Sequence, residues 1–201
     1  MAAYMKTEMP FYGVKRPART PVFKAMVERF PIESAVAYER AVLALWSQPH
    51  REEKYMAIRL ARHYRRFIEL PRLPLYRRLI VEGAWWDFVD EVAAHLVGEL
   101  LLRHRGEVGP VMDLWVGDDD MWVRRSAILS QLRHGEETDE ERLFAYCLRC
   151  AEERAFFIRK AIGWSLRQYA RVAPDAVLRF VRENDDVLSG LSKREALKHL
   201  R

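Results

Sequence analysis

One stretch of the sequence combines residue types that could do chemistry, residues 83–90 with the sequence GAWWDFVD. Trp86 and Asp90 stand four residues apart, so on a helix they share one face and can bracket a single small group. An indole face beside a carboxylate suits a cation, because the ring attracts positive charge and the carboxylate neutralises it. A structural interpretation is also open, in which the other aromatic residues pack in a core and Asp87 is a helix N-terminal charge. Taken alone, the stretch favours structure over catalysis.

Length and composition indicate a folded protein with a modest preference for anionic partners. The chain has 201 residues, half of them hydrophobic, which is enough material for one large domain or two small ones. Its 34 Lys and Arg exceed its 29 Asp and Glu, so the formal net charge is +5. Because helical proteins also carry many arginines on solvated surfaces, this charge alone does not identify nucleic acid as the partner.

The cysteines and histidines do not predict a metal site. Cys147 and Cys150 form a C-x-x-C pair without a second pair or a histidine cluster to complete a zinc site. The six histidines are scattered and none has the H-E-x-x-H spacing. No segment reaches the roughly 18 apolar residues that span a bilayer, and the N-terminus lacks an apolar signal region. We therefore expect a cytoplasmic protein with no metal, no cofactor and no membrane partner.

The spacing of apolar residues predicts an all-α protein. Residues 1–20 indicate a short helix and a loop, and from residue 21 to residue 46 apolar residues recur at intervals of three and four, which predicts two amphipathic helices. No alternating strand pattern of useful length occurs between the breaks. The breaks are expected at Pro31, residues 47–49, Pro71 and Pro74, residues 106–110, residues 117–118, residues 134–135 and Pro174.

An internal repeat accounts for the spacing of these breaks. When four short helical segments are stacked, Ala57, Ala93, Ala127 and Ala161 align, at separations of 36, 34 and 34 residues. Each separation can hold one helix pair with its turns. Small residues at these positions would let neighbouring helices approach closely, and stacked pairs would curve into an α-solenoid with one concave face. A non-repeating helical bundle is the alternative.

The same stacking places charged residues at equivalent positions of neighbouring repeats. Asp90 superposes on Arg124, whereas Arg125 lies one residue step, roughly 100°, around the helix. Trp164 also falls off the line of Asp90. This register does not by itself bring Asp90, Arg125 and Trp164 together, so helix curvature or a shifted register would have to do so.

Five groups of residues, taken in this order, form a specific combination, although each group alone is weak. They are Tyr4-Met5-Lys6 with Gly13-Val14 and Pro17, residues 85–90, Trp122 and Arg125 with residues 127–129 and Gln131-Leu132, residues 156–158 with residues 160–164, and residues 191–196. Through them the chain resembles, nearly end to end, the AlkD-type DNA alkylation repair glycosylases. The resemblance implies a single domain of HEAT-like repeats over residues 1–201, with residues 1–20 as a helical and loop segment ahead of the repeats.

The resemblance also implies the roles of individual residues. Asp90 would be the catalytic carboxylate, and Trp86 and Trp164 would be the aromatic walls beside the lesion nucleotide. Arg125 would contact the DNA backbone, and Tyr4 would lie near the bound lesion. The family removes N3- and N7-alkylated purines, such as 3-methyladenine and 7-methylguanine, from duplex DNA, and it does so without flipping the base into a pocket.

Arg124, Arg159 and Lys160 lie in the same part of the repeat as Arg125 and are expected to contact DNA phosphates with it. An alkylpurine of this kind is cationic, so it leaves the sugar as a neutral base and needs no general acid. One carboxylate could then suffice to stabilise an oxocarbenium-like sugar and orient water. We expect a monomer that acts on double-stranded DNA. Two non-enzymatic alternatives share the fold, a helical-repeat module that binds DNA without catalysis and a scaffold for a protein partner.

Overall fold

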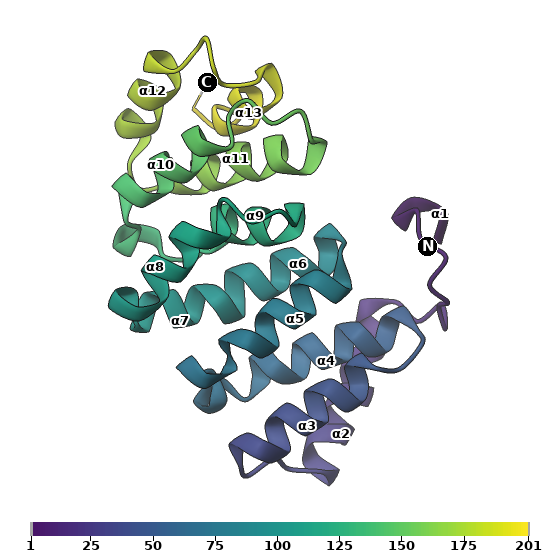
Figure 1. Cartoon of the computed structure of the whole chain (residues 1–201). Helices are drawn as coiled ribbons and strands as arrows, with labels where there is room; N and C mark the ends of the chain where they lie inside the picture. The colour runs from purple at the N-terminus through teal and green to yellow at the C-terminus, as the bar shows by residue number, and fades with distance from the viewer. Residues whose placement is uncertain (1, 201) are drawn as a thin grey trace. The chain divides into compact units, whose positions relative to one another are not determined.

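A computed structural model of the protein describes residues 2–200, and every regular element in this range is helical (Figure 1). The all-α prediction is therefore confirmed, and the fold is one of helical repeats. No helix in the described range is both long enough and apolar enough to cross a membrane. The α-helices are α1 (Ala2–Met5), α2 (Arg16–Arg29), α3 (Ala35–Trp46), α4 (Arg51–His63), α5 (Leu73–Gly83), α6 (Trp86–Val92), α7 (Gly98–Arg103), α8 (Arg105–Trp115), α9 (Met121–Leu129), α10 (Glu140–Arg149), α11 (Phe156–Tyr169), α12 (Pro174–Glu183) and α13 (Gly190–Ala196).

Shorter helical turns connect some of these helices. Three are 3₁₀ turns, η1 (Arg65–Phe67), η2 (Leu70–Arg72) and η4 (Gly135–Glu137), and one is a π-helical turn, η3 (Ala93–Val97), between α6 and α7. The chain divides into two compact units, one up to Leu75 and one from Tyr76 onward. The organisation of residues 1–201 as a single domain stays a prediction.

The first unit contains the two helices predicted between residues 21 and 46. They are α2 and α3, but α2 begins earlier than expected, at Arg16, because Pro17 occupies a first-turn position where no backbone N–H is needed. Ser34 caps α3 by accepting a hydrogen bond from the N–H of Ala37. Helix α3 packs against α4, and the fully buried Tyr38 lies in the core of this unit.

A buried carboxylate fixes the chain ahead of α2. Glu52, in the first turn of α4, accepts hydrogen bonds from the backbone N–H groups of Tyr12, Gly13 and Val14 at 3.1, 3.0 and 3.0 Å. Gly13 has a φ of +81°, a conformation in which glycine is favoured because it carries no Cβ. The predicted short helix and loop are confirmed as α1 and this anchored segment. Tyr4, in α1, is 77% exposed.

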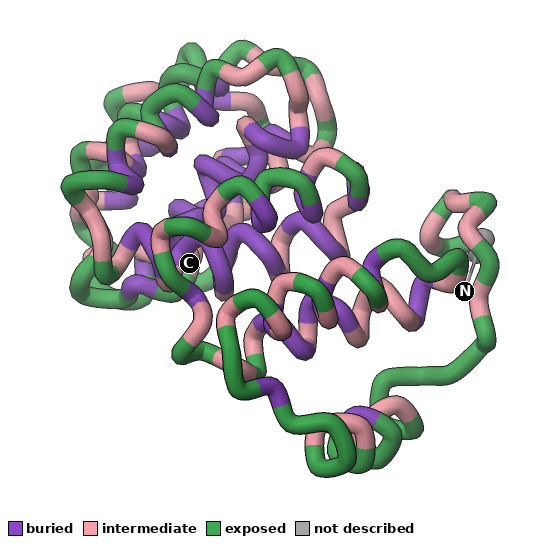
Figure 2. Tube along the Cα trace, turned by 60° about the horizontal axis from the view of Figure 1, so that its bottom comes forward, coloured by how far each residue is buried: buried purple, intermediate pink, exposed green. Residues whose placement is uncertain are grey.

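The second unit contains a layer of four helices that follow one another in space. Helix α9 packs against α6 on one side and α11 on the other, and α13 packs against α11 (Figure 1). Helices α8 and α10 both pack against α9, and α12 packs against α11 and α13. Buried positions recur along the packed helices (Figure 2). Adjacent helices of this layer therefore bring together residues that lie more than 30 residues apart in the sequence.

The alanines that define the repeat are buried at the helix contacts. Ala57, Ala93 and Ala161 are 0% exposed and Ala127 is 1% exposed. A small side chain at such a position allows close helix packing. Their burial supports the repeat that was inferred from the sequence.

One predicted break is wrong. Residues 106–110 were expected to interrupt the helices, but α8 runs through them from Arg105 to Trp115. The break falls at His104, which has a φ of −135°. Pro110 lies inside α8 and deprives the helix of one hydrogen bond. The fully buried Val108 and Met112 lie one turn apart on the same face, and their packing outweighs that loss.

Candidate active site

An ion pair between two helices of the layer forms the centre of the candidate site. The Arg125 guanidinium on α9 donates from Nε to Asp90 Oδ1 and from Nη2 to Asp90 Oδ2, both at 2.8 Å. Its Nη1 donates to the backbone carbonyl of Phe157 on α11. The Arg125 side chain is only 1% exposed and that of Asp90 is 16% exposed. Asp90 is thus held in a fixed orientation, and a small part of its side chain stays exposed.

The start of α6 determines where Asp90 points. Ala84 has a φ of +39°, and Trp85 is extended, so the chain turns sharply before the helix begins at Trp86. Asp87 lies in the first turn, as the structural interpretation of this stretch predicted. Phe88 is fully buried, which places the half-buried Trp86 and Asp90 together on the less buried side of α6.

The partner of Asp90 is Arg125 and not Arg124, which is the residue superposed on it in the repeat. Equivalent residues on two stacked helices point in the same direction, so they do not meet. A contact between neighbouring helices joins residues on different faces, and the 100° step from Arg124 to Arg125 provides that difference. The 100° offset of Arg125 from the position equivalent to Asp90 is therefore what allows the two residues to pair.

Arg124 donates hydrogen bonds to a different set of acceptors from Arg125. Its Nε and Nη2 donate to the two carboxylate oxygens of Glu153 at 2.9 and 2.8 Å. Its Nη1 donates to the backbone carbonyls of Asp118 and Asp119 at 2.7 and 2.9 Å. Arg124 thereby joins the loop before α9 to the loop before α11, and contact between this residue and DNA stays a prediction.

Burial and charge act in opposite directions on Asp90. Burial raises the pKa of the Asp90 carboxyl above its ordinary value, the hydrogen bonds and charge of Arg125 oppose this rise, and the nearby Asp87 and Glu91 add to it. The guanidinium therefore favours the carboxylate form in a place where a negative charge is costly. Such a carboxylate can stabilise a developing positive charge beside it, because the surroundings screen it weakly.

Trp164 lies beside the same ion pair. Its ring centroid is 5.7 Å from Arg125 Cζ, 5.7 Å from Lys160 Nζ and 5.8 Å from Arg167 Cζ. The indole Nε1 donates to Glu195 at 3.2 Å. Arg125 thus pairs with Asp90 and lies near the ring of Trp164, although the sequence register placed Trp164 off the Asp90 line.

An aromatic cluster supports the N-terminal ends of the layer helices. Trp85, Trp122 and Phe157 come from the starts of α6, α9 and α11, and their ring centroids lie 6.1, 5.4 and 5.0 Å apart in pairs. Phe157 also supplies the carbonyl that binds Arg125. Sequence reasoning missed this role of Phe157, because any residue type can supply a backbone carbonyl.

The remaining predicted site residues occupy different places. Arg159 and Lys160 are half-buried on α11, and Lys160 Nζ donates to Glu195 at 2.7 Å. The backbone carbonyl of Arg159 accepts a hydrogen bond from Ser192. Tyr4 belongs to the first unit, and its predicted proximity to a lesion stays a prediction.

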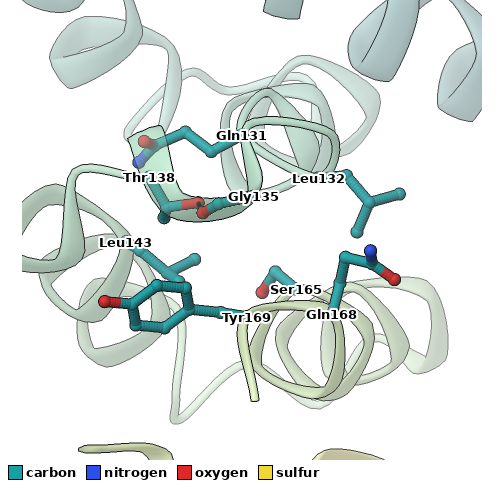
Figure 3. Close-up of a pocket in the computed structure, with 8 residues that line it drawn as sticks. All are labelled: Gln131, Leu132, Gly135, Thr138, Leu143, Ser165, Gln168 and Tyr169. Carbon is teal, nitrogen blue, oxygen red and sulfur yellow. Dashed lines mark hydrogen bonds between the residues drawn. The ribbon is translucent and has the colours of Figure 1, made fainter. Parts of the chain in front are cut away.

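A small pocket elsewhere in the second unit does not coincide with these residues (Figure 3). Its walls come from the turn after α9, the turn around η4, α10 and α11, and it has room for about one water molecule. The residues that line it are Gln131, Leu132, Gly135, Thr138, Leu143, Ser165, Gln168 and Tyr169. None of the predicted site residues is among them.

The fold and the site define a helical-repeat protein that presents a buried carboxylate, paired with arginine, beside an indole surrounded by cations. The sequence model of the family described as DNA alkylation repair enzyme matches residues 1–200. The chain therefore belongs to the DNA alkylation repair enzyme family, which confirms the resemblance and supports a role in the repair of alkylated DNA.

A solved structure agrees with this assignment. The structure described as "Predicted DNA alkylation repair enzyme from Enterococcus faecalis" is 32% identical, with a TM-score of 0.91, and the match covers 100% of this chain and 92% of that one. No curated protein matches the chain.

Proposed function

We propose that this protein is a DNA glycosylase that hydrolyses the N-glycosidic bond of cationic N3- and N7-alkylated purines in duplex DNA. Family membership supports the repair of alkylated DNA. The observation that carries the glycosylase activity is the Asp90 carboxylate, which Arg125 holds by two hydrogen bonds of 2.8 Å. A fixed, partly exposed carboxylate suits a reaction whose transition state is a cationic sugar.

In this mechanism the substrate supplies the leaving-group activation. The alkylated base carries a positive charge, so cleavage of the bond to the sugar gives a neutral base without protonation. Asp90 stabilises the oxocarbenium-like sugar and orients the water that attacks it, and the proton that this water loses passes to solvent. Trp86, one turn before Asp90 on α6, provides an aromatic face to the sugar, an effect worth about 0.5 to 2 kcal/mol.

The charges around Trp164 favour a phosphate near its ring. The charges of Asp90 and Arg125 neutralise each other. Glu195 contributes one negative charge and is paired with two positive charges, those of Lys160 and Arg167. This group of five charges is therefore net positive by one. Positive charge beside an aromatic wall would hold the DNA backbone while Trp164 contacts the adjoining sugar.

Incubation with methylated duplex DNA tests the proposal. We expect release of free 3-methyladenine or 7-methylguanine, scored by chromatography, at a rate above that of spontaneous depurination. Duplex binding without release of either base would contradict the glycosylase proposal and favour the non-catalytic DNA-binding alternative.

DNA binding by this protein is expected to weaken steeply with salt, because basic side chains displace counterions from phosphates. Arg159 is the clearest test, since its half-buried side chain makes no hydrogen bond in the described part of the chain, whereas Arg124 is held by Glu153. Its Nε is buried, so the Nη groups would make the phosphate contact. Arg159→Gln should weaken binding to damaged and undamaged duplex alike and reduce the salt slope by about 0.9. Fluorescence anisotropy at several salt concentrations measures both quantities.

Arg179→Gln is the matched control, because it removes one exposed arginine from α12. An equal loss of slope in both variants would indicate an effect of net charge and contradict a specific phosphate contact at Arg159. A loss confined to damaged DNA would contradict a backbone role.

A further inference from the structure

Glu195, on the C-terminal helix α13, accepts hydrogen bonds from three side chains of α11. Its Oε1 accepts from Lys160 Nζ at 2.7 Å, and its Oε2 accepts from Trp164 Nε1 at 3.2 Å and from Arg167 Nη1 at 2.9 Å. We propose that Glu195 is the positioning residue of Trp164, and that α13 is therefore a working part of the active site. This inference rests on the proposed glycosylase function and deepens it.

The packing of α11 against α13 gives independent support. A Cβ on Gly163, the residue before Trp164, would collide with Glu195 Cβ and would lie 2.9 Å from the backbone oxygen of Ser192. Glycine at this position thus allows the two helices to come almost into backbone contact. Ser192 Oγ also donates to the Arg159 carbonyl at 2.9 Å. The two helices meet at the point where Glu195 must reach the indole.

The hydrogen bond to Nε1 restrains the orientation of the Trp164 ring. An indole has one polar group, and a bond to that group fixes the rotation of a ring that is only half-buried. Arg125 lies 5.7 Å from the same ring, so the orientation of Trp164 relative to the Asp90 ion pair depends on where Glu195 holds it. A displacement of the Trp164 ring would change its position relative to the sugar of the bound nucleotide.

Glu195 also forms ion pairs with two cations beside the Trp164 ring, Lys160 and Arg167. The hydrogen bond from Lys160 lowers the pKa of the Glu195 carboxyl below its ordinary value, burial opposes this, and the charges of Lys160 and Arg167 lower it further. The group is therefore a carboxylate at neutral pH and keeps both cations at the ring. Without it, the two cations would be free to bind phosphate elsewhere, so DNA binding would be retained while the aromatic wall would lose its anchor.

A double-mutant cycle tests whether Glu195 acts through Trp164. Glu195→Gln should lower the single-turnover excision rate by about tenfold, the effect of one hydrogen bond to a charged group, without weakening binding to undamaged duplex. In a Trp164→Phe background the same substitution should change the rate little. An equal fall in both backgrounds, or a fall matched by weaker binding, would overturn the proposal.

Glu140→Gln is the matched control, because Glu140 accepts a hydrogen bond of 2.9 Å from the aromatic side chain of Tyr169, the last residue of α11. It should leave the excision rate unchanged. A tenfold fall in this variant as well would mean that α11 is sensitive to any lost carboxylate, and the specific role of Glu195 would be contradicted.

A spectroscopic measurement separates this inference from the proposed function. The indole N–H resonance of Trp164, assigned as the ¹H–¹⁵N signal missing in Trp164→Phe, should exchange slowly with solvent in the unmodified protein and faster in Glu195→Gln. Rapid exchange in the unmodified protein would overturn the inference even if Glu195→Gln failed to fold. If the protein released no methylated base, the proposed function would fail, while the indole signal would still show whether Glu195 holds Trp164.

Discussion

Asp90→Asn is expected to lower the single-turnover excision rate of 3-methyladenine by about 100-fold or more, while binding of duplex DNA changes little. Asparagine keeps the size of the side chain and removes its charge. In the reaction the charge acts on the sugar as it becomes cationic, so its loss raises the energy of the transition state more than that of the bound substrate. Rapid mixing with excess enzyme measures the excision rate, and anisotropy measures binding.

The substitution also leaves the Arg125 guanidinium buried without its counterion. Breaking a buried ion pair in this way costs about 3 to 5 kcal/mol of folding stability, so the assay must be run well below the melting temperature of the variant. Asp113→Asn is the matched control, because Arg142 holds Asp113 by two hydrogen bonds of 3.0 and 3.1 Å on the neighbouring helices α8 and α10. If Asp90→Asn released the base at the rate of the unmodified protein, or if Asp113→Asn were equally slow, the catalytic assignment of Asp90 would be wrong.

Local patterns in the sequence were sufficient to predict much of the fold. The helical periodicity predicted the all-α class, and the aligned alanines predicted positions that prove to be buried at helix contacts. The predicted break at residues 106–110 failed because proline and glycine act on local backbone preference, whereas the burial of Val108 and Met112 acts through tertiary packing. Only the second effect depends on neighbouring helices, which a local pattern does not contain.

The site also contains both kinds of feature, those that a local pattern predicts and those that depend on neighbouring helices. Trp86 and Asp90 could be paired from the sequence, because both lie in α6 and a spacing of four residues fixes their common face. The partner of Asp90 could not, because it depends on which faces of α6 and α9 meet. The sequence did contain one regularity that could have indicated both ion pairs. Asp90 and Arg125 are 35 residues apart, and Lys160 and Glu195 are also 35 residues apart, which is about one repeat.

Arg125→Met is expected to lower the excision rate at neutral pH by about 100-fold, comparable to the loss of Asp90 itself. Methionine fills part of the buried space without a charge. Burial raises the pKa of the Asp90 carboxyl and the guanidinium opposes the rise, so removal of the guanidinium raises that pKa further. A smaller fraction of Asp90 is then ionised at any given pH. The acid side of the rate profile should therefore move to higher pH, and raising the pH should restore part of the activity.

The pH profile of single-turnover excision, corrected for spontaneous depurination, distinguishes the two roles considered for Arg125. A phosphate contact predicts weaker binding to all duplex DNA with an unchanged profile once the DNA is bound. Support of the Asp90 charge predicts nearly unchanged binding with a displaced profile, which we expect because the Arg125 side chain is 1% exposed and donates to Asp90 and Phe157. Arg142→Met, which removes the corresponding partner of Asp113, should alter neither quantity. An unshifted profile in Arg125→Met would show that the ion pair is not what keeps Asp90 charged.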